Sequence, residues 1–488
     1  MRQLTRRSEL SRFAPDTYLS QLEDVRSPGK AKDRVLPLTA KQVGNTVEGS
    51  VQREGETLRS SSRLLLGISS LWLGLGLLFD GLTTLVLPFH VGTVLGEHHR
   101  GSVLGAIGLA GLAAGMLVQP IVGAASDRLQ SRWRRRGMIG VGLAATLVAL
   151  AAFGASRSLV TILLGYTAVQ AAAAIAQAGQ QGFIPDLVSS QHRGKAAGWK
   201  GFMDVGGATL GFVVLGQLLG GRTVWPALGA IAVTLILTFL PTVWLVREPA
   251  QPPVPEPTAS VLSAFRIDHR RHAMFVRLVA SRFLFLLGTF AVGRFFLFFI
   301  EDRLGLRGDE AAPVAGMLLG TLALLTALAA PLAGWAADRL GRLPPMWIGA
   351  AASAIGVLGL VAADSVGWIL LSGGLMAVGS AAFSTANWAL TADVVPRVES
   401  ARFFGLANVG TAGAAAAAGL FGPLVDVGNA ASPGRGYTAL FLGVSVVFVL
   451  SGLTIRGLSV PMSQVRPPRR AEPMGAGEAE EEGSSSLT

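Results

Sequence analysis

The sequence predicts an all-α membrane protein with twelve membrane-spanning helices in two similar halves of six. Of its 488 residues, 51% are hydrophobic and only 15% are charged, which is too few charges for the surface of a soluble protein of this size. Apolar stretches of about 20 residues, each long enough to cross a bilayer as a helix, recur between residues 64 and 456. Runs this apolar are not the strands of a membrane barrel, so helices are expected.

The amino-terminal part begins with residues 1–62, which mix charged residues with Ser and Gly and contain no apolar run typical of a signal peptide. We expect a cytoplasmic tail that is mostly disordered. The first six-helix half follows at residues 63–246. Its spans are expected at residues 64–92, 102–122, 138–156, 159–184, 196–220 and 224–246.

A Pro-rich and then basic segment, residues 247–276, separates the two halves and is expected to be a cytoplasmic linker. The second half is residues 277–456. A carboxyl-terminal tail, residues 457–488, is basic and then acidic, which predicts disorder in the cytoplasm. The spans of the second half are expected at residues 277–300, 311–333, 343–363, 366–391, 403–425 and 436–456.

The Lys and Arg residues predict the orientation. If the amino terminus is inside the cell, the inner loops and the linker contain 17 of them and the outer loops six. Membrane proteins concentrate these residues in cytoplasmic loops. We therefore expect a multi-pass protein of the cell (inner) membrane with both termini in the cytoplasm. The six outer residues are Arg100, Arg157, Arg222, Arg303, Arg307 and Arg435.

Composition also excludes several kinds of function. The chain has no cysteine, so disulfides, thiolate metal sites and cysteine nucleophiles are excluded, and its six histidines lack zinc-like spacing. We expect no metal and no cofactor. The net charge of +11 lies in tails and loops, so nucleic acid is not an expected partner. A Walker-type loop, a nucleophile elbow and a zincin motif are all missing from the sequence, which argues against an enzyme.

The two halves repeat one motif. Gly123 begins Gly-Ala-Ala-Ser-Asp-Arg-Leu after the second span, and Gly334 begins Gly-Trp-Ala-Ala-Asp-Arg-Leu-Gly-Arg after the eighth, 211 residues later. Asp186 and Asp393, after the fourth and tenth spans, are 207 residues apart. Similar spacings at two places indicate a duplication.

This doubled loop resembles the signature of the major facilitator superfamily over residues 64–456. The resemblance implies a monomeric alternating-access fold, with lipid and a small-molecule substrate as partners. It also implies that the motif latches the halves together on the cytoplasmic side, although its charges could serve only to anchor the orientation. The candidate gate residues are Gly123, Asp127, Arg128, Gly334, Asp338, Arg339 and Arg342.

A finer resemblance is to sucrose-transporter-like and glycoside–cation symporters. It is carried by Gln119-Pro, the following Ser-Asp-Arg and the Arg-rich run to Arg136, and by Ile184-Pro-Asp-Leu-Val. Two features depart from that pattern. Arg134 stands where the pattern has Gly, and the fourth span lacks the acidic residue that plant-type sucrose transporters use for coupling.

Ionisable residues within spans are costly and are candidates for function. Asp80, in the middle of the first span, is expected either to couple a proton or cation or to form a fixed ion pair. Lys200 and Asp204 share one face of the fifth span, as a structural pair or with Asp204 in the cavity wall. Arg294, deep in the seventh span, could hold an anionic substrate group or pair with Asp80.

Polar and aromatic residues of the fourth and tenth spans complete the candidate cavity. Gln170, Gln177 and Gln181 form one stripe, which could bind substrate hydroxyls or join helices. Asn387 and Trp388 are their counterparts in the tenth span, and an indole beside an amide suits a sugar ring, but could also be ordinary packing.

These residues predict secondary active transport, with protons driving the uptake of a sugar or a similar polar solute. Proton-driven efflux of amphipathic compounds is the alternative within transport. A non-transporting membrane receptor on the same fold is a second alternative, disfavoured by the doubled motif and by buried charge in both halves.

Overall fold

The computed structural model describes residues 62–96, 100–127, 134–188, 192–248, 272–395 and 400–458. The predicted tail before residue 62, most of the predicted linker and the predicted tail after residue 458 lie outside these residues. Within them, every regular element is a helix, and twelve helices are long and apolar enough to cross a membrane. The predicted fold class is confirmed.

The first half begins with a span that changes its helical geometry midway. This span consists of α4 (Ser62–Gly76), the π-helix η2 (Leu77–Val86) and α5 (Leu87–Leu95). The other spans of this half are α6 (Arg100–Asp127), α7 (Arg134–Gly154), α8 (Leu159–Gln181), α10 (Arg193–Leu219) and α11 (Trp225–Leu245), with the short α9 (Phe183–Leu187) after α8.

The second half has longer helices than the apolar runs predict, because charged ends continue several of them. The seventh span, for example, was expected at 277–300 and extends over Ala273–Leu304. The spans are α12 (Ala273–Leu304), α13 (Gly308–Leu340), α14 (Leu343–Val361), α15 (Val366–Val394), a broken eleventh span of α16 (Ser400–Ala417), η6 (Ala418–Phe421) and α17 (Gly422–Ala431), and α18 (Arg435–Thr454).

Equivalent caps begin the fourth and tenth spans. The side chain of Ser158 accepts a hydrogen bond from the backbone N–H of Thr161, and that of Ser365 accepts one from the N–H of Trp368. Each cap satisfies a donor that the first turn of a helix leaves unpaired. The two serines are 207 residues apart, the same spacing as Asp186 and Asp393, so the repeat extends to local structure.

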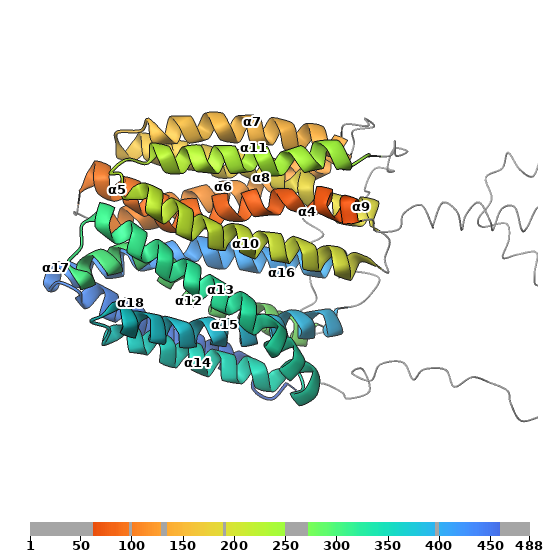
Figure 1. Ribbon diagram of the computed structural model, residues 1–488. Coiled ribbons are helices and arrows are strands. Elements are labelled where there is room, and N and C mark those ends of the chain that lie inside the picture. Colours follow the sequence, from red (N-terminus) through yellow and green to blue (C-terminus); the bar gives the residue numbers. More distant parts are fainter. Residues whose placement is uncertain are drawn as a thin grey trace, which may run out of the picture. The chain divides into compact units, whose positions relative to one another are not determined.

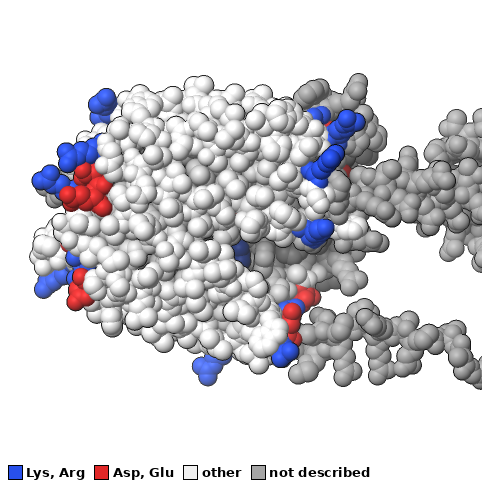
Figure 2. Space-filling view, viewed as in Figure 1, with Lys and Arg blue, Asp and Glu red and all other residues white. Residues whose placement is uncertain are grey.

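The sides of the bundle are apolar. Val148, Trp244 and Leu332 are each more than 70% exposed. In Figure 2 the charged side chains gather at the two ends of the bundle, and almost none lie on the sides that face the viewer. An exposed apolar belt between charged ends is what contact with lipid requires.

The helices alternate in direction, so the bundle has two ends. We call the end where α4 begins and α18 ends the near end, and the opposite end the far end. In Figure 1 the first-half helices, coloured red to yellow-green, and the second-half helices, coloured green to blue, form separate groups that meet along α10, α13, α6 and α16.

Glycines bring the two halves together at backbone distance toward the far end. A Cβ on Gly105 of α6 would collide with the carbonyl oxygen of Gly419, and a Cβ on Gly316 of α13 would collide with that of Phe212. The contacts are related by the repeat, because Gly105 and Gly316 are 211 residues apart and Phe212 and Gly419 are 207 apart. Small residues at such crossings are typical of membrane helix pairs.

Candidate functional site

Asp80 lies in the π-helical part of the first span and faces the fifth span. Its carboxylate and that of Asp204 on α10 are close enough to repel each other. The helices touch beside them, since a Cβ on Gly76 would collide with the backbone carbonyl of Asp204. π-Helical turns inside α-helices occur frequently at functional sites.

Lys200 completes this group, which we call the carboxyl cluster (Asp80, Asp204 and Lys200). Lys200 attracts the Asp204 carboxylate, and its Nζ lies 3.8 Å from the centre of the Trp72 ring. Among the described residues, no cation lies within 4.0 Å of the Asp80 carboxylate. The structure therefore places Asp80 beside a second acid rather than in an ion pair.

Arg294 on α12 is the most deeply buried charged group in the middle of the bundle, with 4% of its surface exposed. Its Nη2 donates to the carbonyl oxygen of Ala415 at 2.9 Å, whereas Nε and Nη1 have no hydrogen-bond partner. The guanidinium packs against Gly108 of α6, where a Cβ would overlap Nη1. Arg294 thus lies at the contact between the halves.

Three polar side chains lie on the first-half side of this position. Gln170 Nε2 donates to the hydroxyl of Tyr166 at 2.6 Å, and that hydroxyl lies 2.9 Å from Thr83 Oγ1. Tyr166 interacts electrostatically with Arg294. We call Thr83, Tyr166, Gln170 and Arg294 the guanidinium cluster. Thr83 is three residues after Asp80, so the π-helix adjoins both clusters.

The other predicted glutamines are not in this cluster. Gln177 accepts a hydrogen bond from Gln119 of α6 at 3.2 Å, and Gln181 is exposed at the end of α8. Gln180, which is off the predicted stripe, is buried and donates to the carbonyl of Ile68 at 2.7 Å. Of the stripe, Gln170 is therefore the residue that bonds to Tyr166, which in turn interacts with Arg294.

Asn387 and Trp388 contact the seventh span. Asn387 is buried and donates to the carbonyl of Leu278 at 3.3 Å. Trp388 is 39% exposed and stacks on Arg282, whose Cζ lies 4.6 Å from the ring centre. Arg282 also donates to Thr411 at 3.1 Å. These contacts are within the second half.

The second-half motif forms a cluster of charges at the near end, which we call the second-half bracket (Asp338, Arg342 and Asp393). Arg342 Nη1 lies 2.5 Å from Asp338 Oδ1, and its Nε lies 3.1 Å from Asp393 Oδ2 at the end of α15. Burial alone would lower the pKa of Arg342, but its hydrogen bonds to the two acids outweigh this and raise the pKa. Arg339 instead stacks on Trp335, and Gly334 faces Thr385.

The first half has the matching bracket. Arg135 Nε lies 3.1 Å from Asp186 Oδ2, a separation of 51 residues that is the same as between Arg342 and Asp393. Sequence analysis overlooked Arg135 because four extra residues in this loop displace it from the motif position. The sequence feature that could have identified Arg135 is its spacing of 207 residues to Arg342, the same as between Asp186 and Asp393. Gly123 lies in the last turns of α6 and Asp127 ends it, but the side chain of Asp127 and the whole of Arg128 lie outside the described residues.

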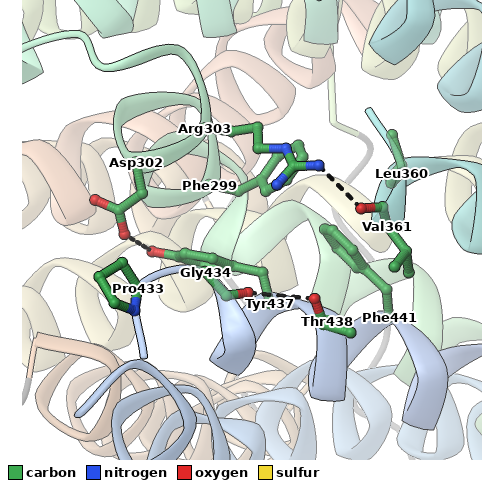
Figure 3. Close-up of a pocket in the computed structure, with 10 residues that line it drawn as sticks. All are labelled: Phe299, Asp302, Arg303, Leu360, Val361, Pro433, Gly434, Tyr437, Thr438 and Phe441. Carbon is green, nitrogen blue, oxygen red and sulfur yellow. Dashed lines mark hydrogen bonds between the residues drawn. The ribbon is translucent and has the colours of Figure 1, made fainter. Parts of the chain in front are cut away.

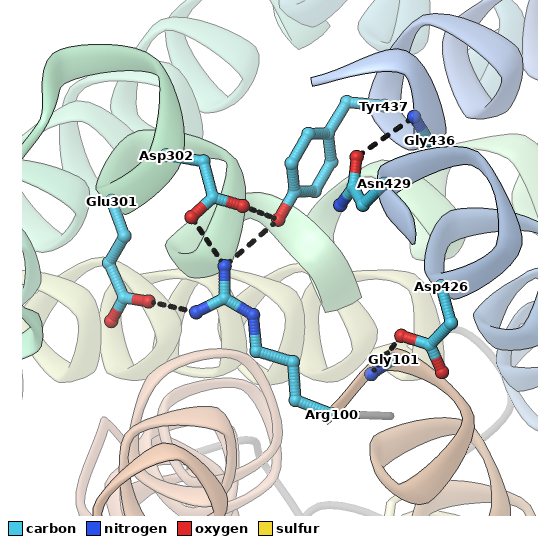
Figure 4. A network of polar contacts seen from close by, with 8 residues as sticks. All are labelled: Arg100, Gly101, Glu301, Asp302, Asp426, Asn429, Gly436 and Tyr437. Carbon is cyan, nitrogen blue, oxygen red and sulfur yellow. Dashed lines mark hydrogen bonds and ion pairs between the residues drawn. The ribbon is translucent and has the colours of Figure 1, made fainter. Parts of the chain in front are cut away.

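A polar network joins the two halves at the far end (Figure 4). Arg100, at the start of α6, pairs with Glu301 at 2.8 Å and with Asp302 at 2.5 Å, both on α12. Tyr437 of α18 donates to Asp302 at 2.6 Å and accepts from Arg100 at 3.3 Å. Arg100 also lies over the ring of Phe298 at 4.4 Å.

Two more contacts extend this far-end network. The carboxylate of Asp426 on α17 accepts from the backbone N–H groups of Gly101 and Ser102, at 2.9 and 2.6 Å, and so caps α6 from the other half. Arg222 pairs with Asp309 at 2.6 Å. The far end is therefore closed by charge-assisted contacts between the halves.

Two cavities lie beside the far-end network, away from the carboxyl cluster and from Arg294. The larger, about 420 Å³, lies between the halves and includes Arg100, Arg222 and Asp309 in its wall. The smaller, about 160 Å³, lies within the second half below Arg303, which donates to the carbonyl of Val361 (Figure 3). We place the candidate site at the two clusters because they hold the buried charge.

Comparison with known proteins identifies the family. The family model for the Major Facilitator Superfamily matches residues 71–320 and 309–483. No curated protein is similar enough in sequence to be recognised as a relative.

Solved structures of low sequence identity share the fold. A bacterial homologue of the human lysosomal transporter Spinster, inward-facing and unoccupied, has a TM-score of 0.61 at 15% identity over 81% of this chain and 94% of its own. A D-xylose–proton symporter has a TM-score of 0.61 at 17% identity over 81% and 98%. The nucleoside transporter NupG has a TM-score of 0.60 at 15% identity over 83% and 100%.

Proposed function

Because the chain belongs to the major facilitator superfamily, we propose that it couples the entry of protons to the uptake of a sugar or a similar polar solute. The chain is a multi-pass membrane transporter of that superfamily. The proton, the direction and the solute are the parts proposed. They rest on the two polar clusters inside the bundle.

The carboxyl cluster is the observation that carries proton coupling. Asp80 and Asp204 interact electrostatically inside the membrane, and Asp80 has no ion-pair partner among the described residues. Two carboxylates repel when both are charged, and a proton on either one removes the repulsion. Proton relays in transporters are built from such intramembrane acids. We assign Asp80 as the proton site and Asp204 as its neighbour across the helix contact.

The guanidinium cluster supports a polar solute. Thr83, Tyr166 and Gln170 present two hydroxyls and an amide between the halves, near the level at which transporters of this architecture bind substrate. Such groups bind hydroxyls by hydrogen bonds. An apolar cavity for amphipathic compounds would not contain them.

The closed far end supports a direction of access. With both termini in the cytoplasm, as the positive residues predict, the far end faces outward and is closed in this structure. Release of the solute and proton then needs no further opening at the far end. Reloading requires the far-end network to separate and the halves to rock about the clusters.

The test is uptake into proteoliposomes with and without an inward proton gradient. Radiolabelled disaccharides, monosaccharides and cationic drugs form the panel, and Asp80→Asn is compared with Asp364→Asn, the same change in an exposed loop. We expect gradient-driven accumulation of a polar solute by the wild type and Asp364→Asn, and its loss in Asp80→Asn.

Two outcomes would overturn the proposal. If Asp80→Asn transports normally with an unchanged pH dependence, Asp80 is not the proton site. If only drugs move, against their gradient and with no sugar signal, the protein is an exporter. Binding of solutes without any accumulation would favour the receptor alternative.

A further inference from the structure

Arg294 has hydrogen-bonding capacity that the protein does not use. The side chain is 96% buried, yet only Nη2 has an acceptor, and Nε and Nη1 have none. No carboxylate among the described residues lies within 4.0 Å of it. A buried cation without a counter-ion is expensive in a bilayer, so such a group is retained only where it serves a purpose.

From this geometry we infer that Arg294 binds an anionic group of the transported solute, a carboxylate or a phosphate. The inference rests on the proposed transport function and narrows its substrate class to organic acids, such as sugar acids or sugar phosphates. A guanidinium is planar, and each of its edges can donate two hydrogen bonds to such an anion. Each edge of Arg294 contains one nitrogen that lacks an acceptor.

The surroundings fit a solute that has both hydroxyls and an anionic group. Tyr166, Gln170 and Thr83 lie on the other side of the contact between the halves and offer hydroxyl and amide groups beside the cation. Gly108 leaves room for the guanidinium itself, because any Cβ there would overlap it. The position belongs to both halves, as a site visited from alternate sides requires.

The far-end network does not neutralise Arg294. Glu301 is seven residues further along α12, about 10 Å along the helix axis, and its carboxylate pairs with Arg100. Asp302 and Asp426 are likewise bound to Arg100 and to the start of α6. The charge on Arg294 therefore has no competing anion at that end.

The experiment measures binding and transport separately on the purified full chain. The probes are D-glucose, D-glucuronate, D-glucose 6-phosphate, gluconate, lactate and inorganic phosphate, each tested for a shift in Tm at equal ionic strength and for uptake into proteoliposomes. The variants are Arg294→Gln and Arg294→Lys. Arg277→Gln is the matched control, since Arg277 is on the same helix and donates to backbone carbonyls at the near end.

We expect at least one anion, and not D-glucose, to raise the Tm of the wild type and of Arg277→Gln. Arg294→Gln should lose this shift, and its KM for that anion should rise roughly 10–100-fold. Arg294→Lys keeps the charge without the planar edges and should fall between the two, and it serves as the test if Arg294→Gln does not fold.

Three results would overturn the inference: no anion shifts the wild-type Tm, the same shift occurs in Arg294→Gln, or a neutral solute is transported with a wild-type KM by Arg294→Gln. The last of these leaves the proposed transport function intact. If anions bind but no solute is taken up, the anion site at Arg294 is supported and the proposed uptake is contradicted.

Discussion

At the scale of single residues, a buried arginine, Arg294, packs against a glycine, Gly108. Arg294 occupies space that only a glycine at position 108 leaves free. From the sequence, Arg294 stands out as an arginine within an apolar run, whereas Gly108 is one of 62 glycines and nothing distinguishes it. Its role depends on a contact between helices that are far apart in the sequence, and no local pattern encodes that contact.

Substitution of Gly108 should therefore act through Arg294. Gly108→Ala places a methyl group on Nη1, and overpacking of this kind costs about 1–3 kcal/mol. We expect a lower Tm and at least a tenfold loss of uptake. Gly229→Ala is the control, because a Cβ at Gly229 has no neighbour within 4 Å. Equal behaviour of the two variants would mean that Arg294 can leave its position freely.

At the scale of elements, apolar length predicted all twelve spans but not their internal irregularities. The first span contains ten π-helical residues, Leu77–Val86, although its apolar run is continuous. The eleventh span is broken at Ala418–Phe421, just before Pro423, which cannot donate a backbone hydrogen bond. Helix continuity depends on backbone hydrogen bonds, which hydropathy does not register.

We expect the far-end network to hold the bundle closed at the far end. Because the chain lacks cysteine, Thr84→Cys provides a single reactive thiol on η2, between the two ends. We expect Arg100→Gln to raise its labelling by a membrane-impermeant maleimide added at the far side several-fold, since Glu301 and Asp302 lose their shared partner.

The control for this labelling is Arg435→Gln, an exposed arginine at the same end. It should leave the rate unchanged. A labelling rate that Arg100→Gln also leaves unchanged would show that the glycine contacts alone keep the far end closed.

At the scale of the whole molecule, the duplication is visible in chemistry as well as in fold. The Arg135–Asp186 and Arg342–Asp393 pairs span 51 residues each. Each pair ties the start of the third span of a half to an aspartate that follows or ends its fourth span, on α9 in the first half and on α15 in the second. The sequence contained both aspartates as repeat partners. The insertion in the first-half loop shifts Arg135 away from the motif position. Its equivalence to Arg342 therefore became visible only from its contact with Asp186 in the structure.

The two brackets should respond to charge changes in the same way. Arg342→Asp should reduce uptake, because it places three acids together, and adding Asp393→Arg should recover a substantial part of the loss. The same exchange at Arg135 and Asp186 should do likewise. Uptake that is unaffected by either single reversal would make these pairs dispensable for transport.

The orientation of the whole bundle is open to a direct test. Asp364→Cys is exposed at the far end and Lys195→Cys at the near end. In intact cells an impermeant maleimide should label Asp364→Cys, and Lys195→Cys only after permeabilisation. The reverse pattern would place both termini outside and would contradict the orientation predicted from Lys and Arg.

The glycine contacts between the halves have a kinetic consequence. At Gly105, Gly316 and Gly419 backbone lies against backbone, so no side chain has to withdraw from a neighbour's groove when the halves part. The halves can separate at these glycines without a rotamer change, and few side chains have to repack in the transition state. The charged contacts around Arg100 then form the main barrier to opening, and we expect the turnover rate to depend on these contacts more than on the volume of the buried side chains.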